Sequence, residues 1–179
     1  MTLLDRLAWA VSRAGALLSS AATLLCLVLI CVTVAARYLL GMPIGWADKV
    51  ASWLVVALVL LGAPEAQRRF EHIGVDVAVA RAGPRLARLI RLVGALAVAA
   101  VAAILLAAGI ETVQFSRMVG LMTDVEGVPE WWIQSLLPIG GALLLVVALA
   151  QVASLALGRD PPHLPRPGAG TPHDPLARE

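Results

Sequence analysis

Uncharged residues form four long runs along the chain, separated by short polar segments. The runs cover residues 14–36, 50–64, 92–110 and 131–158. A helix of the first 23 positions is about 34 Å long, which is enough to cross the ~30 Å hydrocarbon core of a bilayer. The pattern predicts four transmembrane helices, at about residues 14–38, 46–69, 86–115 and 131–157.

The ends of the first two runs need separate arguments. The first run could be a cleaved signal peptide, with Val34-Ala35-Ala36 as a cleavage motif. A signal peptide has an apolar region of only about 7–15 residues, so the longer run favours a retained helix. The second run has 15 uncharged positions, and we extend it to Trp46 and Gln67. Lys49 would then lie near the headgroups, where its stem can snorkel.

The third and fourth runs carry signs of how their helices pack. Ten of the 19 residues in 92–110 are Ala or Gly, which would let helices approach closely, although an Ala-rich codon bias explains the composition equally well. Trp131 and Trp132 open the fourth run, as is typical of a membrane interface. Pro138 lies about two turns inside it and predicts a kink, because proline removes a backbone hydrogen bond.

Composition supports a membrane protein. Hydrophobic residues make up 60% of the chain and charged residues 15%, whereas soluble domains have about 45–50% and about 25%. These values exclude disorder and nucleic-acid binding and disfavour a soluble enzyme. Cys26 and Cys31 are five residues apart and suggest neither a disulfide nor a metal site. We therefore predict an all-α integral membrane protein with a single four-helix domain over residues 1–158.

The basic residues predict the orientation. Four spans place both termini on one side, and Arg and Lys mark the cytoplasmic side. The N-terminal segment, the loop 65–91 and the C-terminal tail together carry 11 basic residues, against 3 in the other two loops. The loop 111–130 has a net charge of −3. We therefore predict that both termini and the loop 65–91 are cytoplasmic.

The loop between the second and third spans predicts local structure of its own. Alternating apolar residues at 73–79 predict a short interfacial helix that ends at Gly83-Pro84. The same loop carries four arginines at spacings that line one helix face, namely Arg81, Arg85, Arg88 and Arg91. They would either anchor the chain among lipid headgroups or form a specific anionic-lipid site. The tail, residues 159–179, has six prolines and is predicted to be disordered.

The spans lack the residues that membrane chemistry requires. None has a charged residue near its centre, where proton relays, ion sites and substrate sites normally need one. His72, His163 and His173 all lie outside the spans, so paired histidine ligands for haem are not available. No metal-ligand spacing, nucleophile–base pair or phosphate loop is present. The sequence predicts an accessory subunit with no enzymatic activity, cofactor or metal.

Several short motifs give the chain a family resemblance. In order they are Arg37-Tyr38, Trp46-Ala47-Asp48, Gly62-Ala63, His72-Ile73-Gly74-Val75-Asp76 and Pro138-Ile139-Gly140. Together with the four spans, they resemble the small permease subunit (DctQ-like) of tripartite ATP-independent periplasmic (TRAP) transporters over roughly residues 10–155. Lys49 departs from the family, where an acidic residue is expected, and this puts in doubt a carboxylate pair at the start of the second helix.

The resemblance implies a function without a substrate site in this chain. In the family, a periplasmic binding protein delivers an organic acid, and a large permease subunit carries the substrate and sodium sites. The small subunit resembles a scaffold that packs beside the large subunit and helps to dock the binding protein. Two other functions stay open: a self-contained oligomeric transporter or channel, and a membrane anchor of a redox complex.

Within this reading, some residues are candidates for contacts with the other subunits. Trp46 and Trp53 share a helix face, but Trp53 is too deep for an aromatic belt, so it packs either on the large subunit or against lipid and core. Arg37 and Asp48 bracket the first outer loop and suggest a salt bridge, a contact with the large subunit, or simple interfacial placement.

The remaining candidates lie in the other two loops. Glu126 and Glu130, together with Asp124, either contact the binding protein or form a solvated acidic loop. His72 and Asp76 are expected to cap or orient the interfacial segment.

Overall fold

The computed structural model describes residues 3–42, 44–69 and 84–157, and these residues are almost entirely helical. The helices are α1 (Leu3–Leu39), α2 (Ala47–Arg69), α4 (Pro84–Val119), α5 (Glu130–Gln134) and α6 (Leu136–Ala156). With α5 and α6 taken as one span, four helices are long and apolar enough to cross a membrane. The predicted all-α, four-span class is confirmed.

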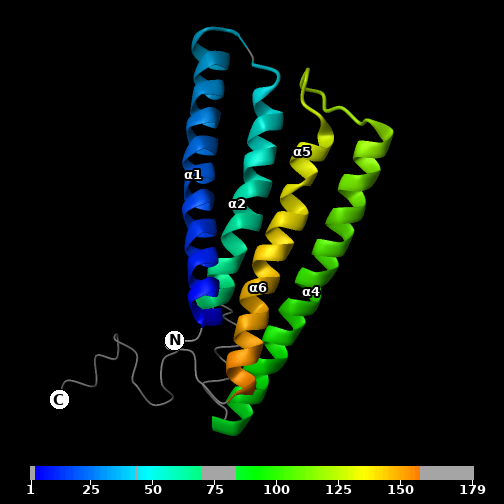
Figure 1. Ribbon diagram of the computed structural model, residues 1–179. Helices are drawn as coiled ribbons and strands as arrows, with labels where there is room; N and C mark the ends of the chain where they lie inside the picture. Colours follow the sequence, from blue (N-terminus) through cyan, green and yellow to red (C-terminus); the bar gives the residue numbers. More distant parts are fainter. Residues whose placement is uncertain (1–2, 43, 70–83, 158–179) are drawn as a thin grey trace, which may run out of the picture.

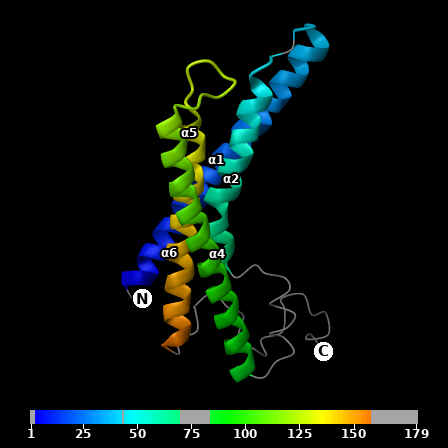
Figure 2. The ribbon, with the colours of Figure 1, turned by 90° about the vertical axis from the view of Figure 1, so that its right-hand side faces the viewer.

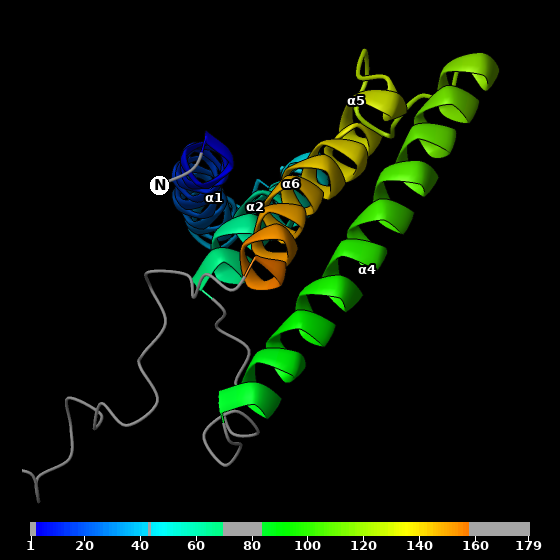
Figure 3. The same ribbon diagram turned by 60° about the horizontal axis from the view of Figure 1, so that its bottom comes forward.

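The helices form two antiparallel hairpins, α1–α2 and α4–α5–α6 (Figure 1). Seen from below, they stand in one row, with α2 and α6 in the middle and α1 and α4 at the edges (Figure 3). From the side, the two hairpins cross and splay apart toward the end that carries α5 (Figure 2). We call the end that carries α5 the tip end. The opposite end, where α1 and α4 begin, is called the basic end.

Glycines allow the central helices to approach closely. A Cβ atom at Gly15 of α1 would lie 2.5 Å from the Leu61 carbonyl oxygen of α2. A Cβ atom at Gly140 of α6 would lie 2.7 Å from the Leu60 side chain of α2. Real Cβ atoms do not come so close to other heavy atoms, so these crossings require glycine. Packing in the row therefore depends on small residues at the contacts.

The small residues of the third run face α6. Ala95, Ala99 and Ala102 are all buried on one side of α4. A Cβ atom at Gly109, seven residues beyond Ala102, would meet the Pro138 ring of α6 at 2.7 Å. This periodic placement on the contact face favours close packing over codon bias as the reason for the composition.

Two prolines shape the helices at their contacts. The fourth span is interrupted at Ser135, between α5 and α6. The break follows from Pro138, which cannot donate to the carbonyl of Gln134 four residues earlier. Pro64 lies buried inside α2 and in the same way leaves the Leu60 carbonyl without an intrahelical donor.

The two edge helices are longer than the predicted spans. α1 has 37 residues and α4 has 36, so each is about 54–56 Å long. Glu111 and Arg117, which the charge count assigned to an outer loop, lie within α4. The outer loop proper therefore begins only after Val119. The predicted interfacial helix and the tail lie outside the described residues.

Candidate functional site

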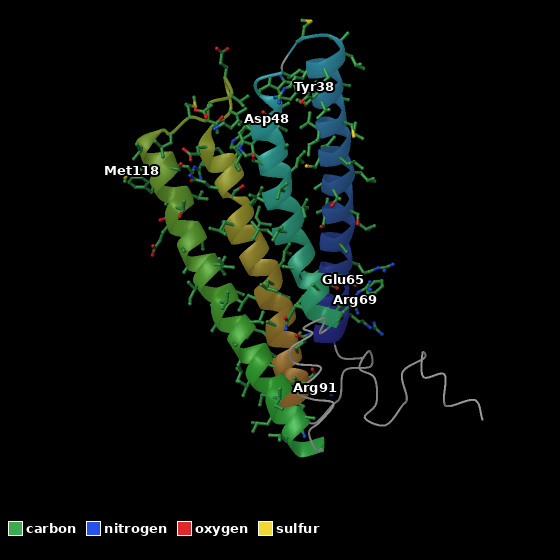
Figure 4. The ribbon with its side chains drawn as sticks, turned by 180° about the vertical axis from the view of Figure 1, so that it is seen from behind. Tyr38, Asp48, Glu65, Arg69, Arg91 and Met118 are labelled. Atoms are coloured by element: carbon green, nitrogen blue, oxygen red, sulfur yellow. The ribbon has the colours of Figure 1, made fainter. Side chains whose placement is uncertain are left out.

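Two exposed ion pairs lie at the tip end. Asp48 lies at the start of α2 (Figure 4). Its Oδ2 atom is 3.7 Å from Nη2 of Arg37, which lies near the end of α1. Lys49 Nζ is 2.6 Å from Asp124 Oδ2 in the loop between α4 and α5. The first pair closes one hairpin and is one of the three alternatives left open for these residues. The second pair joins the two hairpins and was not predicted from the sequence.

The loop that carries Asp124 is ordered by its own hydrogen bonds. Gly120 and Gly127 adopt φ values of 71° and 79°, a left-handed conformation that favours glycine. Between them, the Thr123 hydroxyl donates to carbonyls of the same loop, at 2.9 Å for Val128. The ordered conformation of the loop therefore places the Asp124 carboxylate in contact with Lys49.

The Lys49 ammonium lowers the pKa of the Asp124 carboxyl below its ordinary value, first by hydrogen bonding and then by its charge. The lysine thus supplies a link to the second hairpin at the position where the family resemblance led us to expect an acid. Both side chains are exposed, so the pair contributes little to the stability of the fold.

The other predicted contact residues are spread over the tip end. Trp46 is exposed and Trp53 is half-buried in α2. Glu126 is exposed in the loop, whereas Glu130 is half-buried and begins α5. These predicted contact residues therefore come from three different segments, namely α2 with the residue before it, the loop before α5, and α5 itself.

Aromatic contacts tie α5 to α4. The Arg117 guanidinium lies 4.7 Å from the ring centre of Trp131, a cation–π contact. Trp131 and Trp132 pack edge to face with their ring centres 5.9 Å apart.

A reciprocal pair of buried amides joins the middle helices near the basic end. Gln67 Nε2 of α2 donates to Gln151 Oε1 of α6 at 2.7 Å, and Gln151 Nε2 donates to the Gln67 backbone carbonyl at 2.7 Å. The two residues are only 2% and 7% exposed. Sequence reasoning missed this pair, because two glutamines 84 residues apart leave no periodic signal.

A buried carboxylate lies at the basic end of the α1–α2 hairpin, where Figure 4 places Glu65 beside Arg69. Arg68 donates to both oxygens of Glu65, at 2.8 and 2.7 Å. Arg69 Nε donates to Glu65 Oε1 at 2.8 Å. The buried Ser12 of α1 lies against the same carboxylate. One acid therefore holds two arginines of the neighbouring turn.

The predicted arginine stripe divides into different environments. Arg88 Nε donates to the Leu155 carbonyl at 2.9 Å, and its Nη2 bonds the same oxygen, so Arg88 caps the last turn of α6. Arg91 is only 9% exposed. Arg85 lies in the first turn of α4. Arg81, His72 and Asp76 lie outside the described residues. Of the stripe, then, one member is a helix cap and one is buried.

The edge helices present apolar side chains away from the row. Exposed examples are Leu17, Leu24 and Val28 on α1, and Val101 and Ile104 on α4. The row thus offers apolar surfaces for lipid or another membrane protein.

Within residues 3–42, 44–69 and 84–157, no group of three His, Cys, Asp or Glu side chains could hold a metal ion.

Comparison with known proteins gives the family. No curated protein matched the chain. A family model described as "Tripartite ATP-independent periplasmic transporters, DctQ component" matches residues 6–158, which is most of the chain and covers the described helices except the first three residues of α1. The chain belongs to the DctQ family and is the small component of a TRAP transporter.

Proposed function

We propose that this chain is a scaffold subunit that supports the large permease subunit during sodium-driven, binding-protein-dependent uptake of an organic acid. The coupling ion and the class of solute come from the family resemblance. The chain itself would bind neither of them, because substrate and sodium sites lie in the large subunit in this family.

One observation carries this proposal. The central parts of the four spanning helices, residues 14–36, 50–64, 92–110 and 131–156, contain no Asp, Glu, Lys, Arg or His side chain. A path for a charged solute or for sodium needs polar or charged groups at that depth. The polar clusters that the structure describes lie instead toward the two ends of the row. Such an arrangement supports a partner that moves solute rather than solute movement by this chain.

We place the basic end in the cytoplasm and the tip end in the periplasm of an inner-membrane protein. The excess of basic residues at the basic end supports this orientation. In this frame the tip, with Glu126 and Glu130, would meet the periplasmic binding protein. An apolar face of the row, with Trp53 on α2, would meet the large subunit.

Co-expression with the large permease subunit tests the scaffold role. We expect the two subunits to co-purify, and we expect Trp53→Ala to reduce the yield of the complex. Trp132→Ala is a matched control, because Trp132 is an exposed tryptophan on the other hairpin. Unchanged co-purification of Trp53→Ala would remove Trp53 from the interface, and separate purification of the wild-type subunits would contradict the scaffold role.

A charge reversal tests docking of the binding protein. The double variant Glu126→Lys/Glu130→Lys should impair uptake by the whole transporter while leaving the two membrane subunits associated. Glu111→Lys makes a similar change at an exposed acid within α4 and should have a smaller effect. Full uptake by the double variant would refute docking at these glutamates.

A further inference from the structure

We propose that the basic end of the α1–α2 hairpin is a binding site for the phosphate headgroup of an anionic phospholipid. Arg13 of α1 and Arg69 of α2 would bind the phosphate, and Trp9 would lie beside it at the level of the glycerol. This inference does not depend on the transport role, because it concerns only side chains of this chain.

The geometry of the hairpin brings the two arginines to one side. Ser12 and Glu65 face each other across the contact between α1 and α2. The next residue after Ser12 on α1 is rotated by about 100° away from the contact, and the residue four positions after Glu65 on α2 is rotated by about 40°. Because the helices are antiparallel, both rotations lead to the same side of the pair. Those residues are Arg13 and Arg69. Both are exposed, Arg69 with 52% of its side chain.

Glu65 acts as a positioning residue for this site. Its side chain is only 10% exposed, and it accepts a hydrogen bond from Arg69 Nε, the inner nitrogen of the guanidinium. Arg68 and Arg69 are consecutive and would otherwise diverge by about 100° around the helix. The shared carboxylate holds both guanidinium groups at the contact between the helices. An ordinary surface anchor needs no buried acid.

The charge of this corner favours an anion. Residues 3–13 of α1 and 65–69 of α2 carry four arginines, Arg6, Arg13, Arg68 and Arg69, against Asp5 and Glu65, which leaves a net charge of +2. Guanidinium groups bind phosphate oxygens through paired N–H donors. An anionic headgroup neutralises this excess, whereas phosphatidylcholine brings a cation of its own.

An aromatic side chain completes the patch. Arg6, Trp9 and Arg13 follow each other at intervals of three and four and therefore share one face of α1. Trp9 is 48% exposed, and the Arg13 guanidinium lies 5.8 Å from its ring centre. A half-exposed indole beside a cation is typical of the membrane interface and favours a lipid over a soluble phosphate.

The arginines at the start of α4 are less suited to this role. Arg88 is engaged with the carbonyls at the end of α6, and Arg91 is buried. At the basic end, the structure describes an exposed arginine beside an interfacial tryptophan at the α1–α2 corner, where Arg13 lies next to Trp9. The site therefore belongs to the first hairpin, and not to the α4 stripe that the sequence indicated.

Lipid titration of the purified full chain tests the site. The protein in a neutral detergent is titrated with phosphatidylglycerol, phosphatidylcholine or inorganic phosphate, and its unfolding temperature is followed by tryptophan fluorescence. A ligand that binds only the folded state raises this temperature as its concentration exceeds Kd. We expect phosphatidylglycerol to raise it, and the other two compounds to leave it nearly unchanged.

Variants locate the effect. Arg13→Gln/Arg69→Gln should weaken phosphatidylglycerol binding by about tenfold or more, while Arg37→Gln/Arg117→Gln, with the same loss of charge at the tip end, should leave it unchanged. Glu65→Gln distinguishes a specific site, in which Glu65 positions the arginines, from nonspecific attraction of the lipid to the net positive charge. It makes the protein more positive, so diffuse attraction predicts tighter binding, whereas loss of the positioning carboxylate predicts weaker binding.

Each variant is compared with its own lipid-free form, so a change in basal stability does not enter the comparison. If Glu65→Gln does not fold, the comparison of Arg13→Gln/Arg69→Gln with Arg37→Gln/Arg117→Gln still tests the site, because Arg13 and Arg69 are exposed. Equal loss in both double variants, tighter binding by Glu65→Gln, or an equal response to phosphatidylcholine would overturn the site. An equal response to inorganic phosphate would overturn the assignment to a lipid.

Discussion

Replacing Gln151 by Leu should destabilise the junction between the two hairpins. The change removes the acceptor of Gln67 Nε2 and the donor to the Gln67 backbone carbonyl, each at 2.7 Å. Hydrogen bonds between helices in membranes are worth about 0.6 kcal/mol on average, and a buried polar group that loses its partner costs about 1–3 kcal/mol. Because Gln67 stays buried, we expect a loss of about 1–3 kcal/mol in the free energy of unfolding.

Titration with sodium dodecyl sulfate in detergent micelles, followed by circular dichroism, measures this loss. Gln114→Leu is the control, because Gln114 is exposed on α4 and its replacement should change stability by less than about 0.5 kcal/mol. The double variant Gln67→Leu/Gln151→Leu should recover part of the loss, since both amide side chains are then gone. Equal costs for Gln151→Leu and Gln114→Leu, or a double variant with the full sum of both single losses, would refute a coupled pair.

Gly141→Ala should destabilise the chain by about 1–3 kcal/mol in the same unfolding assay, because the new Cβ would lie 2.9 Å from the backbone of α4, whereas Gly45→Ala meets nothing within 4 Å and should be neutral. Arg88→Gln should cost about 0.5–1.5 kcal/mol by uncapping α6, and equal stability would remove that role. The Lys49–Asp124 pair should persist above the ordinary Asp pKa of about 3.9 and be lost as the pH falls through the lowered value; carbon NMR titration checks this, and a Lys49→Gln variant that leaves the Asp124 pKa lowered would contradict it.

Charge-free runs were enough to predict the four spans, because a helix must satisfy its own backbone in lipid and needs a fixed apolar length. The pairing of Arg37 with Asp48 could also be suggested, since the two residues bracket a short loop. Pro138 predicted a disturbance in the fourth helix for a reason that is local to the backbone. Features that depend on neighbouring residues were therefore accessible from the sequence.

Contacts between distant helices were not accessible. The pairs Gln67–Gln151, Arg88–Leu155 and Lys49–Asp124 depend on how two helices align along their axes. Helices that are apolar on every side carry no stripe that fixes this alignment. The same reasoning explains why the α4 arginines looked like one surface in the sequence, while packing against α6 turned one of them into a helix cap.

Solute flux into proteoliposomes tests most directly whether this chain is a scaffold without a solute path. Vesicles contain this chain alone, the large permease subunit alone, or both, with the binding protein outside and an inward sodium gradient, and uptake of radiolabelled organic acids is measured. We expect sodium-dependent uptake only when both membrane subunits and the binding protein are present. Uptake by vesicles that contain this chain alone, or full uptake by vesicles that lack it, would contradict the scaffold role.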